Sequence, residues 1–441
     1  MSFMKYETYK DSGVEWFNLV PSHWEIQPCR SVFVERTEKN EPQICGDYLS
    51  LMANIGVIPY EEKGDVGNKK PEDLGKCKQV FPGDLVINSM NYGIGSYGLS
   101  TYRGVCSPVY IVLTPKQEKI EERFAFRILE TKQFQKYAQS FGNGILEHRA
   151  AINWDILKVI GIPIPPIDEQ RKILVFLDTQ VAQIDLLVTE QEKLIGLLTE
   201  KRQAVISRAV TKGIQRNVRL KNSEDSWLGD IPEHWDRIAL KWISRRFSGG
   251  TPDKTKIEYW TEGTIPWLNS GAVNDRYIIT PSALITEDAF NSSSAKWIPK
   301  DALVMALAGQ GRTKGMVAQL GIPTTSNQSM AAIVLEEGVD SRFIYWWLES
   351  NYENIRNLGG GDLRDGLNLE MLGNISCPIP PLEEQAMISR YLDKETTHFD
   401  KLCSEARNTI SLLQERRSAL VSLAVTGQID VRNAKAAENY A

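Results

Sequence analysis

The feature that most constrains this chain is an internal repeat. The phrase "IPIPPIDEQ" at 162–170 returns as "CPIPPLEEQ" at 377–385, so that Gln385 corresponds to Gln170. An earlier phrase, "WFNLVPSHW" at 16–24, returns as "WLGDIPEHW" at 227–235, so that Trp227 corresponds to Trp16. The interval between the two phrases is slightly longer in the second copy. The sequence therefore predicts two copies of one structural unit, each close to half of the chain.

Each copy of the proline phrase is followed by a heptad-like pattern. Such a pattern, sustained over several turns, is typical of a helix that pairs with another helix. The seam positions share one register in both copies and are Ile173, Leu177, Ile184, Leu187, Leu194, Leu198 and Val205, then Ile388, Leu392, Phe399, Leu402, Thr409, Leu413 and Leu420. We expect two helices of about 45 residues, roughly 65 Å long. Neither can bury its stripe alone, so we expect them to pack antiparallel.

The proline pairs mark the boundary between a globular part and a helix. Pro165-Pro166 and Pro380-Pro381 require an extended backbone and cannot lie inside a helix. The acidic residues that follow each pair place negative charge at a helix N-terminus, where it is favourable. The phrase therefore predicts a globular domain that ends and a long helix that begins.

Together these patterns predict an α+β fold. We expect two mixed α/β domains in a pseudo-twofold arrangement, separated by two long antiparallel coiled-coil helices. The expected boundaries are 1–165 and 216–380 for the domains, 166–215 and 381–430 for the helices, and 431–441 for a C-terminal tail. A pseudo-twofold protein suits duplex DNA with two half-sites, and because the two domains differ in sequence, the half-sites should differ too.

The composition fits a cytoplasmic protein without a membrane segment. There is no run of 18 or more apolar residues, and the N-terminus lacks an apolar signal region. The six cysteines are scattered, which indicates free thiols in a reducing compartment. The net charge of −5 neither suggests nor excludes DNA, since binding depends on local patches.

The doubled phrase with its doubled helix resembles the specificity subunit of type I restriction-modification systems. The paired tryptophan openings are similar to the usual openings of that family. In the second copy, "SGGTP" at 248–252, "EYW" at 258–260 and "IPWL" at 265–268 resemble the start of its target recognition domains. The first copy lacks "SGGTP", so the resemblance implies a different subtype for its domain.

The resemblance implies a function without catalysis in this chain. A specificity subunit binds a bipartite, asymmetric DNA sequence through two target recognition domains, and its helices act as a spacer. It docks two methyltransferase subunits and, through them, two motor-nuclease subunits. The cofactors of such a complex, S-adenosylmethionine, ATP and magnesium, belong to the partners, and none is expected in this chain.

A search for catalytic motifs agrees with that expectation. The chain has no phosphate-binding loop of the G-x-x-x-x-G-K-[ST] type, and neither proline pair follows Asn or Asp as it does in adenine methyltransferases. The four histidines and six cysteines have no metal-ligand spacing. His23 and His234 are repeat-equivalent, but each precedes an anchoring tryptophan, so we expect structural roles for them.

Loops that combine glycine with polar or basic residues are the candidate DNA contacts. Polar side chains read base edges, and basic ones bind phosphates. The candidates are Lys69, Lys70, Asn88, Ser89, Asn91, Tyr92, Asn143 and Arg149 in the first domain, and Arg245, Arg246, Lys254, Gln310, Arg312, Thr313, Lys314, Asn327, Gln328 and Arg364 in the second. For each, the alternative is a tight hairpin or a solvated basic face with no ligand.

Two alternative functions stay open. One is a specificity subunit of a related system, whose partner is a fused methyltransferase-nuclease. The other is a coiled-coil adaptor that bridges proteins and reads no DNA, although it would leave the two divergent domains unexplained. An acidic chain should bind DNA weakly by itself, so we expect the partner to contribute basic surface.

Overall fold

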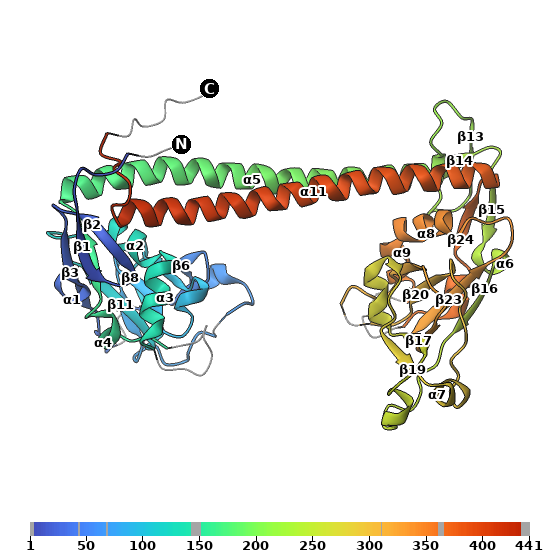
Figure 1. Ribbon diagram of the computed structural model, residues 1–441, viewed down its shortest axis with the longest axis horizontal. Helices are drawn as coiled ribbons and strands as arrows, with labels where there is room; N and C mark the ends of the chain where they lie inside the picture. Colours follow the sequence, from blue (N-terminus) through green and yellow to red (C-terminus); the bar gives the residue numbers. More distant parts are fainter. Residues whose placement is uncertain are drawn as a thin grey trace. The chain divides into compact units, whose positions relative to one another are not determined.

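The computed structural model describes residues 4–42, 45–67, 69–142, 151–309, 311–359 and 366–433. The chain divides into two compact units (Figure 1). Unit 1 comprises 1–192 and 408–441, and unit 2 comprises 193–407. Each unit holds one mixed α/β domain and a stretch of each long helix. The expected α+β class with two such domains is confirmed.

The domain of unit 1 is built around an antiparallel sheet of four strands in the order β4-β11-β8-β9. Four strand pairs, β1-β2, β3-β12, β5-β6 and β7-β10, complete it. The strands are β1 Tyr9–Val14, β2 Phe17–Pro21, β3 Glu25–Pro28, β4 Phe33–Glu35, β5 Leu49–Met52, β6 Gly56–Pro59, β7 Lys78–Val80, β8 Leu85–Asn88, β9 Tyr97–Leu99, β10 Gly104–Cys106, β11 Tyr110–Pro115 and β12 Gly161–Ile164. The helical segments are α1 Cys29–Val32, η1 Tyr60–Lys63, η2 Tyr92–Ile94, α2 Glu122–Leu129, α3 Lys132–Ser140 and α4 Trp154–Leu157.

The domain of unit 2 has a five-stranded sheet, β16-β23-β20-β21-β18, and a smaller sheet, β19-β17-β22. The strands are β13 Leu220–Asn222, β14 Asp230–Pro232, β15 Asp236–Ala239, β16 Ser244–Ser248, β17 Ile265–Leu268, β18 Tyr277–Ile278, β19 Ala283–Ile285, β20 Leu303–Ala306, β21 Val317–Leu320, β22 Thr325–Ser326, β23 Met330–Leu335 and β24 Ser376–Ile379. The helical segments are α6 Leu240–Ile243, η3 Ile257–Tyr259, η4 Ser270–Asp275, α7 Glu287–Asn291, α8 Ser341–Ser350, α9 Tyr352–Asn357 and α10 Leu369–Gly373.

The repeated proline phrase forms the same structure in both units. Its first half is a strand, β12 or β24, that pairs antiparallel with the strand after the opening tryptophans: Ile162 lies opposite Gln27, and Cys377 lies opposite Ile238. The proline pair then ends the strand, and the long helix starts at Ile167 in one unit and at Leu382 in the other. The extended entry expected from the prolines is therefore present in both copies.

The two long helices are α5, Ile167–Lys212 with 46 residues, and α11, Leu382–Val425 with 44 residues. In unit 1 the start of α5 packs against the end of α11, and Ile173 and Leu177 share a core with Leu420 and Val425. In unit 2 the end of α5 and the start of α11 likewise join one core. The stretches run antiparallel within each unit, as expected.

The seam positions of the long helices differ in burial along their length. Ile173, Leu177, Ile388 and Leu392 are fully buried, because there a domain also covers the helix. Nearer the middle of α5, Leu187 and Leu194 are close to half exposed. The helix pair alone therefore buries its stripe incompletely.

A hydrogen-bonded clasp, formed by Trp24, His23 and Glu169, joins the opening phrase to the first turn of α5 in unit 1. Trp24 Nε1 donates to Glu169 Oε1 at 3.0 Å, and His23 Nε2 lies 2.8 Å from Glu169 Oε2. Unit 2 repeats this clasp with Trp235, His234 and Glu384, at 3.2 Å and 2.8 Å. The structural roles expected for the two histidines are consistent with these contacts.

Each long helix ends on a glycine that lies against the tryptophan of a clasp. Gly213 follows α5 with a φ of +73°, and Gly427 follows α11 with a φ of +71°, a conformation that favours glycine. A Cβ on Gly427 would lie 2.4 Å from Pro21 and 3.1 Å from Trp24. Beyond Gly427, the Asp430 amide donates to the Met4 carbonyl, so the C-terminal stretch lies beside the N-terminal one in unit 1.

All six cysteines are free, as expected. In the part of the chain that the structure describes, no helix is long and apolar enough to span a bilayer. The same residues include no group of three or more His, Cys, Asp or Glu side chains that could hold a metal ion.

Candidate nucleic-acid interface

In unit 2 the "SGGTP" loop packs directly onto the loop between β22 and β23. The Gly250 amide donates to the Ser326 carbonyl at 2.8 Å, and a Cβ on Gly249 would lie 1.9 Å from that same oxygen. The Thr251 hydroxyl donates to Gln328 Oε1. The two glycines therefore allow the backbones to approach closely, and Gln328 is held at the exposed edge of the paired loops.

Two further candidates belong to this edge. The amide oxygen of Asn327 accepts a hydrogen bond from the Ser329 amide at 3.1 Å, and the Asn327 side chain is partly exposed. Lys254 is exposed in the stretch after "SGGTP". Nearby, the indole of Trp260 donates to the Asp253 carbonyl at 3.1 Å and holds this stretch in place. Polar and basic groups are thus presented on a fixed backbone, as readout of a base edge or phosphate requires.

The second candidate loop of this unit joins β20 to β21. Arg312 is exposed and Thr313 is partly exposed. The Arg312 carbonyl accepts a hydrogen bond from the Tyr352 hydroxyl on α9, which fixes the loop. Lys314 is buried, with 2% of its surface exposed, so the prediction that its ammonium meets DNA is wrong. Gln310 lies outside the described residues.

The two arginines of β16 differ in environment. Arg245 is exposed, with its guanidinium 6.0 Å from the centre of the Phe247 ring. Arg246 instead donates through Nη1 to the carbonyls of Leu240 and Ser244, and burial lowers its pKa. Arg246 therefore stabilises the α6–β16 connection, which makes it the weaker candidate for a DNA contact, whereas Arg245 is free to reach a ligand.

In unit 1 the loop after β8 is more buried than the sequence predicts. Tyr92 is fully buried and its hydroxyl donates to the Leu129 carbonyl, so the prediction that it contacts DNA is wrong. Burial also raises the pKa of Tyr92 well above its usual value. Asn88 is buried at the end of β8 and accepts a hydrogen bond from the Met90 amide at 3.1 Å.

The remaining candidates line a cavity, lie on the surface or fall outside the described residues. Asn88 and Asn91 line a cavity of about 250 Å³, and Ser89 beside them is partly exposed. Lys69 and Lys70 are exposed on the loop that precedes β7. Asn143, Arg149 and Arg364, predicted from the glycine loops before the long helices, lie outside the described residues.

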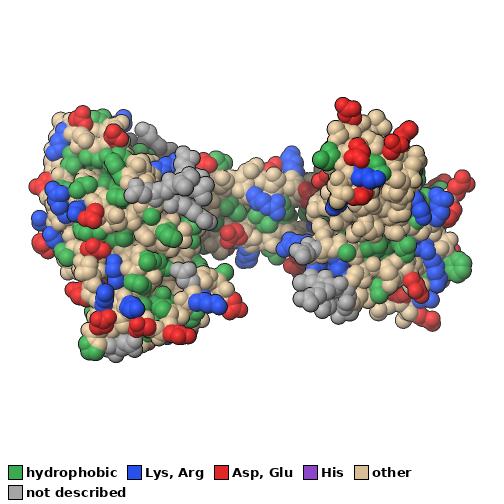
Figure 2. All heavy atoms as spheres, turned by 90° about the horizontal axis from the view of Figure 1, so that it is seen from below, with side chains coloured by type: hydrophobic (Ala, Val, Ile, Leu, Met, Phe, Trp, Pro, Cys, Tyr) green, Lys and Arg blue, Asp and Glu red, His purple; other side chains and the backbone are tan. Residues whose placement is uncertain are grey.

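The surface charge is mixed. Figure 2 shows Lys and Arg side chains interspersed with Asp and Glu on this face of each unit, with no single broad basic surface. On this face, exposed basic residues such as Lys254 and Arg312 of unit 2 therefore stand singly rather than as part of a broad basic patch (Figure 2).

Sequence reasoning missed a pair of exposed leucines on the long helices. Leu197 of α5 is 56% exposed and Leu412 of α11 is 65% exposed. The two occupy equivalent positions of the repeat, and each is followed one turn later by the same pair of charge types, Glu200-Lys201 and Glu415-Arg416. The repeat alignment shows that both positions hold leucine, but the sequence does not show that both side chains are exposed. The sequence alone therefore could not single them out.

The chain matches a family model described as the type I restriction modification DNA specificity domain, at residues 44–195 and again at 232–411. It is 25% identical to the type I restriction enzyme MjaVIII specificity subunit of Methanocaldococcus jannaschii, over 98% of each chain. It is 28% identical to the EcoR124I/EcoR124II specificity subunit of Escherichia coli, over 47% of this chain and 54% of that one.

Two solved structures share the fold. A chain from a structure of complex assembly and conformational transition of the type I R-M system has a TM-score of 0.75 at 14% identity, covering 93% of this chain and 99% of that chain. The HsdS subunit from Thermoanaerobacter tengcongensis has a TM-score of 0.54 at 16% identity, covering 93% and 98%.

Proposed function

Because the chain belongs to the type I restriction-modification DNA specificity family, we propose that it is the subunit of such a complex that reads a bipartite, asymmetric DNA sequence. The observation that carries this proposal is the double match, since the DNA specificity domain occurs once in each half of the chain. One domain would read each half-site. Their different loops, 88–98 in one and 308–315 in the other, support two different half-site sequences.

Readout in unit 2 would use the exposed side chains of two neighbouring loops. Gln328 and Asn327 can bond to base edges, and Arg312 can bond to a guanine or a phosphate. Lys254 and Arg245 suit phosphates, since both are exposed and basic. In unit 1 the exposed candidates are Lys69 and Lys70.

The same subunit would dock two methyltransferase subunits and, through them, two motor-nuclease subunits. Two identical partners require two alike surfaces, whereas the DNA-reading loops should differ. Leu197 and Leu412 meet the first requirement, because they are identical, repeat-equivalent and exposed on the long helices. An exposed leucine on a helix suits the apolar face of a partner helix.

Catalysis and cofactors would belong to the partners. S-adenosylmethionine would be bound by the methyltransferase, and ATP and magnesium by the motor-nuclease. The duplex target and the six free thiols support a cytoplasmic location. A fused methyltransferase-nuclease partner would leave the role of this chain unchanged.

Selection from a random DNA pool tests the proposal, using this chain co-purified with its methyltransferase partner. We expect two different short sequences separated by a fixed gap. Recovery of one sequence, or of none, would contradict it and would favour an adaptor that assembles proteins. Exchange of residues 44–160 for those of a relative should then replace one half-site sequence and leave the other.

A further inference from the structure

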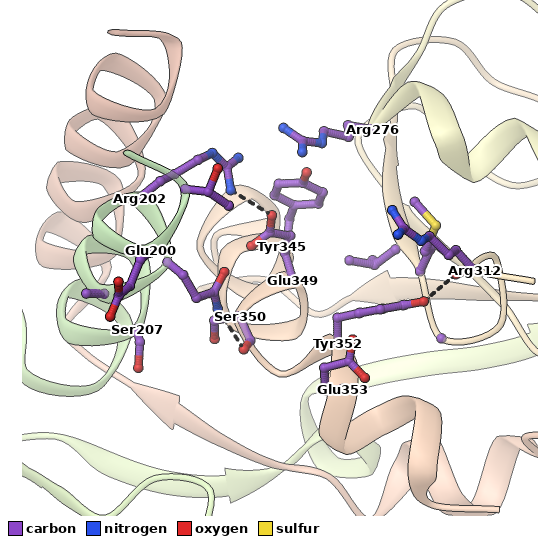
Figure 3. Close-up of a pocket in the computed structure, with 16 residues that line it drawn as sticks. Glu200, Arg202, Ser207, Arg276, Arg312, Tyr345, Glu349, Ser350, Tyr352 and Glu353 are labelled. Atoms are coloured by element: carbon purple, nitrogen blue, oxygen red, sulfur yellow. Dashed lines mark hydrogen bonds and ion pairs between the residues drawn. The ribbon is translucent and has the colours of Figure 1, made fainter. Parts of the chain in front are cut away.

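Each unit contains a latch, a cluster of charged side chains that ties both long helices to a helix of the domain. In unit 2 the centre of the latch is Arg202 of α5. Its Nη1 donates to Oε1 of Glu349 on α8 at 3.2 Å, and its Nε lies 3.4 Å from Oδ1 of Asp400 on α11. Figure 3 shows Arg202 extending from α5 toward α8, with Arg276 and Tyr345 close by.

In unit 1 the latch has the same design with the long helices exchanged. Arg417 of α11 places Nε 3.3 Å from Oδ1 of Asp185 on α5, and Nη1 4.0 Å from Oε2 of Glu130, the residue that follows α2. Arg127 of α2 also donates to Glu130 at 2.7 Å. Each latch therefore consists of an arginine from one long helix, an aspartate from the other and a glutamate from the domain.

The members of the two latches occupy equivalent places in the repeat. Arg202 corresponds to Arg417, and Asp185 to Asp400, in the same alignment of the long helices that superposes Gln170 on Gln385. Glu130 and Glu349 stand at the same distance along the chain from the first residues of α2 and α8. The two copies therefore share the latch, although their candidate DNA-reading loops differ.

The same domain helix is fastened at two more points. Arg123 of α2 lies 2.6 Å from Asp178 of α5, and Arg342 of α8 lies 2.8 Å from Asp393 of α11. The glutamine that ends each proline phrase accepts a hydrogen bond from the residue before the domain helix. These bonds are Glu121 N to Gln170 Oε1 at 2.9 Å and Asp340 N to Gln385 Oε1 at 2.8 Å. Each domain helix is thus attached at its start, near its first turn and at its end.

Of these three points, the latch lies where packing is least complete. A cavity of about 730 Å³ adjoins Arg202 in unit 2, and its walls include Val317 and Tyr345 (Figure 3). A cavity of about 1010 Å³ adjoins Arg417 in unit 1. Arg202 itself is only 11% exposed. Since apolar contacts do not fill these spaces, polar contacts restrain the domain there: the ion pairs of the latch and, in unit 2, the hydrogen bond from Gln203 Nε2 to the Ser350 carbonyl.

We propose that Arg202 and Arg417 are positioning residues that set the gap between the two DNA half-sites. Each holds its recognition domain at one angle on the long helices, so that the reading loops meet the duplex at one register. This inference rests on the proposed function. Without the latch arginine, the domain keeps its other two attachments, its reading loops and, in unit 2, the exposed hydrogen bond from Gln203 Nε2 to the Ser350 carbonyl at 3.2 Å, but it loses the ion pairs of the latch and can pivot over the cavity. The half-site sequences then stay the same, while the gap becomes less strictly defined.

The test compares DNA duplexes that carry the two selected half-sites at gaps from two base pairs shorter to two longer. The chain is co-purified with its methyltransferase partner, and affinity is measured for each gap. For Arg202→Ala we expect the preference for the original gap over its neighbours to fall by roughly fivefold or more. Arg202→Lys, which retains a charge that can reach Glu349, should restore part of the preference. Arg208→Ala, an exposed arginine on the same helix, is the matched control and should behave like the wild type.

The outcomes separate this inference from the proposed function. If the wild-type protein selects no two-part site, the proposed function fails. If it does, and Arg202→Ala keeps the original gap preference, the latch proposal is overturned. Should Arg202→Ala fail to fold, Asp400→Asn removes only one carboxylate, which is 57% exposed, and should relax the gap in the same direction. An unchanged preference in that variant would also count against the proposal.

Discussion

The indole Nε1 of Trp24 donates a hydrogen bond to the carboxylate of Glu169, 145 residues further along the chain, at 3.0 Å. Trp235 makes the same bond to Glu384 at 3.2 Å. The motif pair that first revealed the repeat is thus one structural element, in which the opening phrase is tied to the first turn of the long helix. In unit 1 the hydroxyl of Tyr6 also donates to Glu169, at 2.6 Å.

Replacement of Glu169 by alanine should destabilise unit 1. The change leaves the buried Trp24 indole and the Tyr6 hydroxyl without an acceptor, at a cost of about 1–3 kcal/mol for each group. Amide hydrogen exchange should therefore become faster in β1, β2 and the start of α5, with little change in unit 2. Asp168→Ala is the matched control, since the Asp168 side chain is 90% exposed and should change stability by less than about 0.5 kcal/mol. If amide hydrogen exchange in these segments were equally fast in Glu169→Ala and Asp168→Ala, the clasp would not contribute to the stability of unit 1.

The sequence predicted the fold because its strongest signals are local. Proline pairs end strands, and spacings of three and four residues specify helices, whatever the rest of the chain does. The burial of the candidate DNA-contact side chains could not be predicted, because it depends on segments distant in the sequence. Tyr92 and Lys314 lie in glycine-rich loops but are buried. Arg202 and Glu349 are 147 residues apart in sequence, so no local pattern could join them.

The cysteines should react very unequally with a thiol reagent. Burial raises the pKa of both Cys29 and Cys106 to about 12, and burial also raises the pKa of Cys377. Because the thiolate is the reactive form, these three should stay unlabelled at pH 8 in the folded chain. Cys45, which is partly exposed, should react first. The measurement is mass spectrometry of labelled peptides, and denaturant should make all six react. Rapid native labelling of Cys29 would contradict the described core.

Stability should fall as the pH rises above about 9. The pKa of Cys29 and Cys106 is raised in the fold, as is that of Tyr345, to about 12 in each case. These groups therefore ionise in the unfolded chain at a lower pH than in the folded one. Stability contributed by the protonated forms is complete below the unfolded pKa values and is lost progressively toward pH 12. Denaturant unfolding between pH 8 and 11 measures the effect, and a midpoint that does not fall over this range would contradict it.

Substitutions in the reading loops of unit 2 should separate sequence readout from phosphate binding. Gln328→Ala should weaken binding by about 1–3 kcal/mol and relax one position of one half-site, because it removes a group that can bond to a base edge. Lys254→Ala should weaken binding to all sequences and reduce its salt dependence. Arg246→Ala is an informative comparison, since Arg246 is bonded to backbone carbonyls and its loss should lower stability while the selected sequence is unchanged.

The two exposed leucines predict a stepwise loss of partner binding. Leu197→Asp should remove one methyltransferase subunit, Leu412→Asp should remove one as well, and the double variant should remove both, because a charge cannot be buried against an apolar partner. The mass of the complex in solution distinguishes the double variant from the two single variants, because each lost methyltransferase subunit lowers the mass by one step. Leu382→Asp serves as a control, because Leu382 is also an exposed leucine on a long helix, but its counterpart Ile167 has a different side chain. Retention of both subunits by the double variant would exclude these leucines as the docking sites.

Lengthening both long helices should increase the preferred gap between half-sites. A copy of the preceding seven residues can be inserted after Glu192 in α5 and after Arg407 in α11, where the two compact units meet in sequence. One heptad keeps the seam in register and adds about 10 Å at 1.5 Å per residue, which corresponds to roughly three base pairs at 3.4 Å each. An insertion of four residues at the same places breaks the register and should reduce binding instead. Repeated DNA selection measures both effects, and a gap that stays the same after the heptad insertion would show that the helices do not determine it.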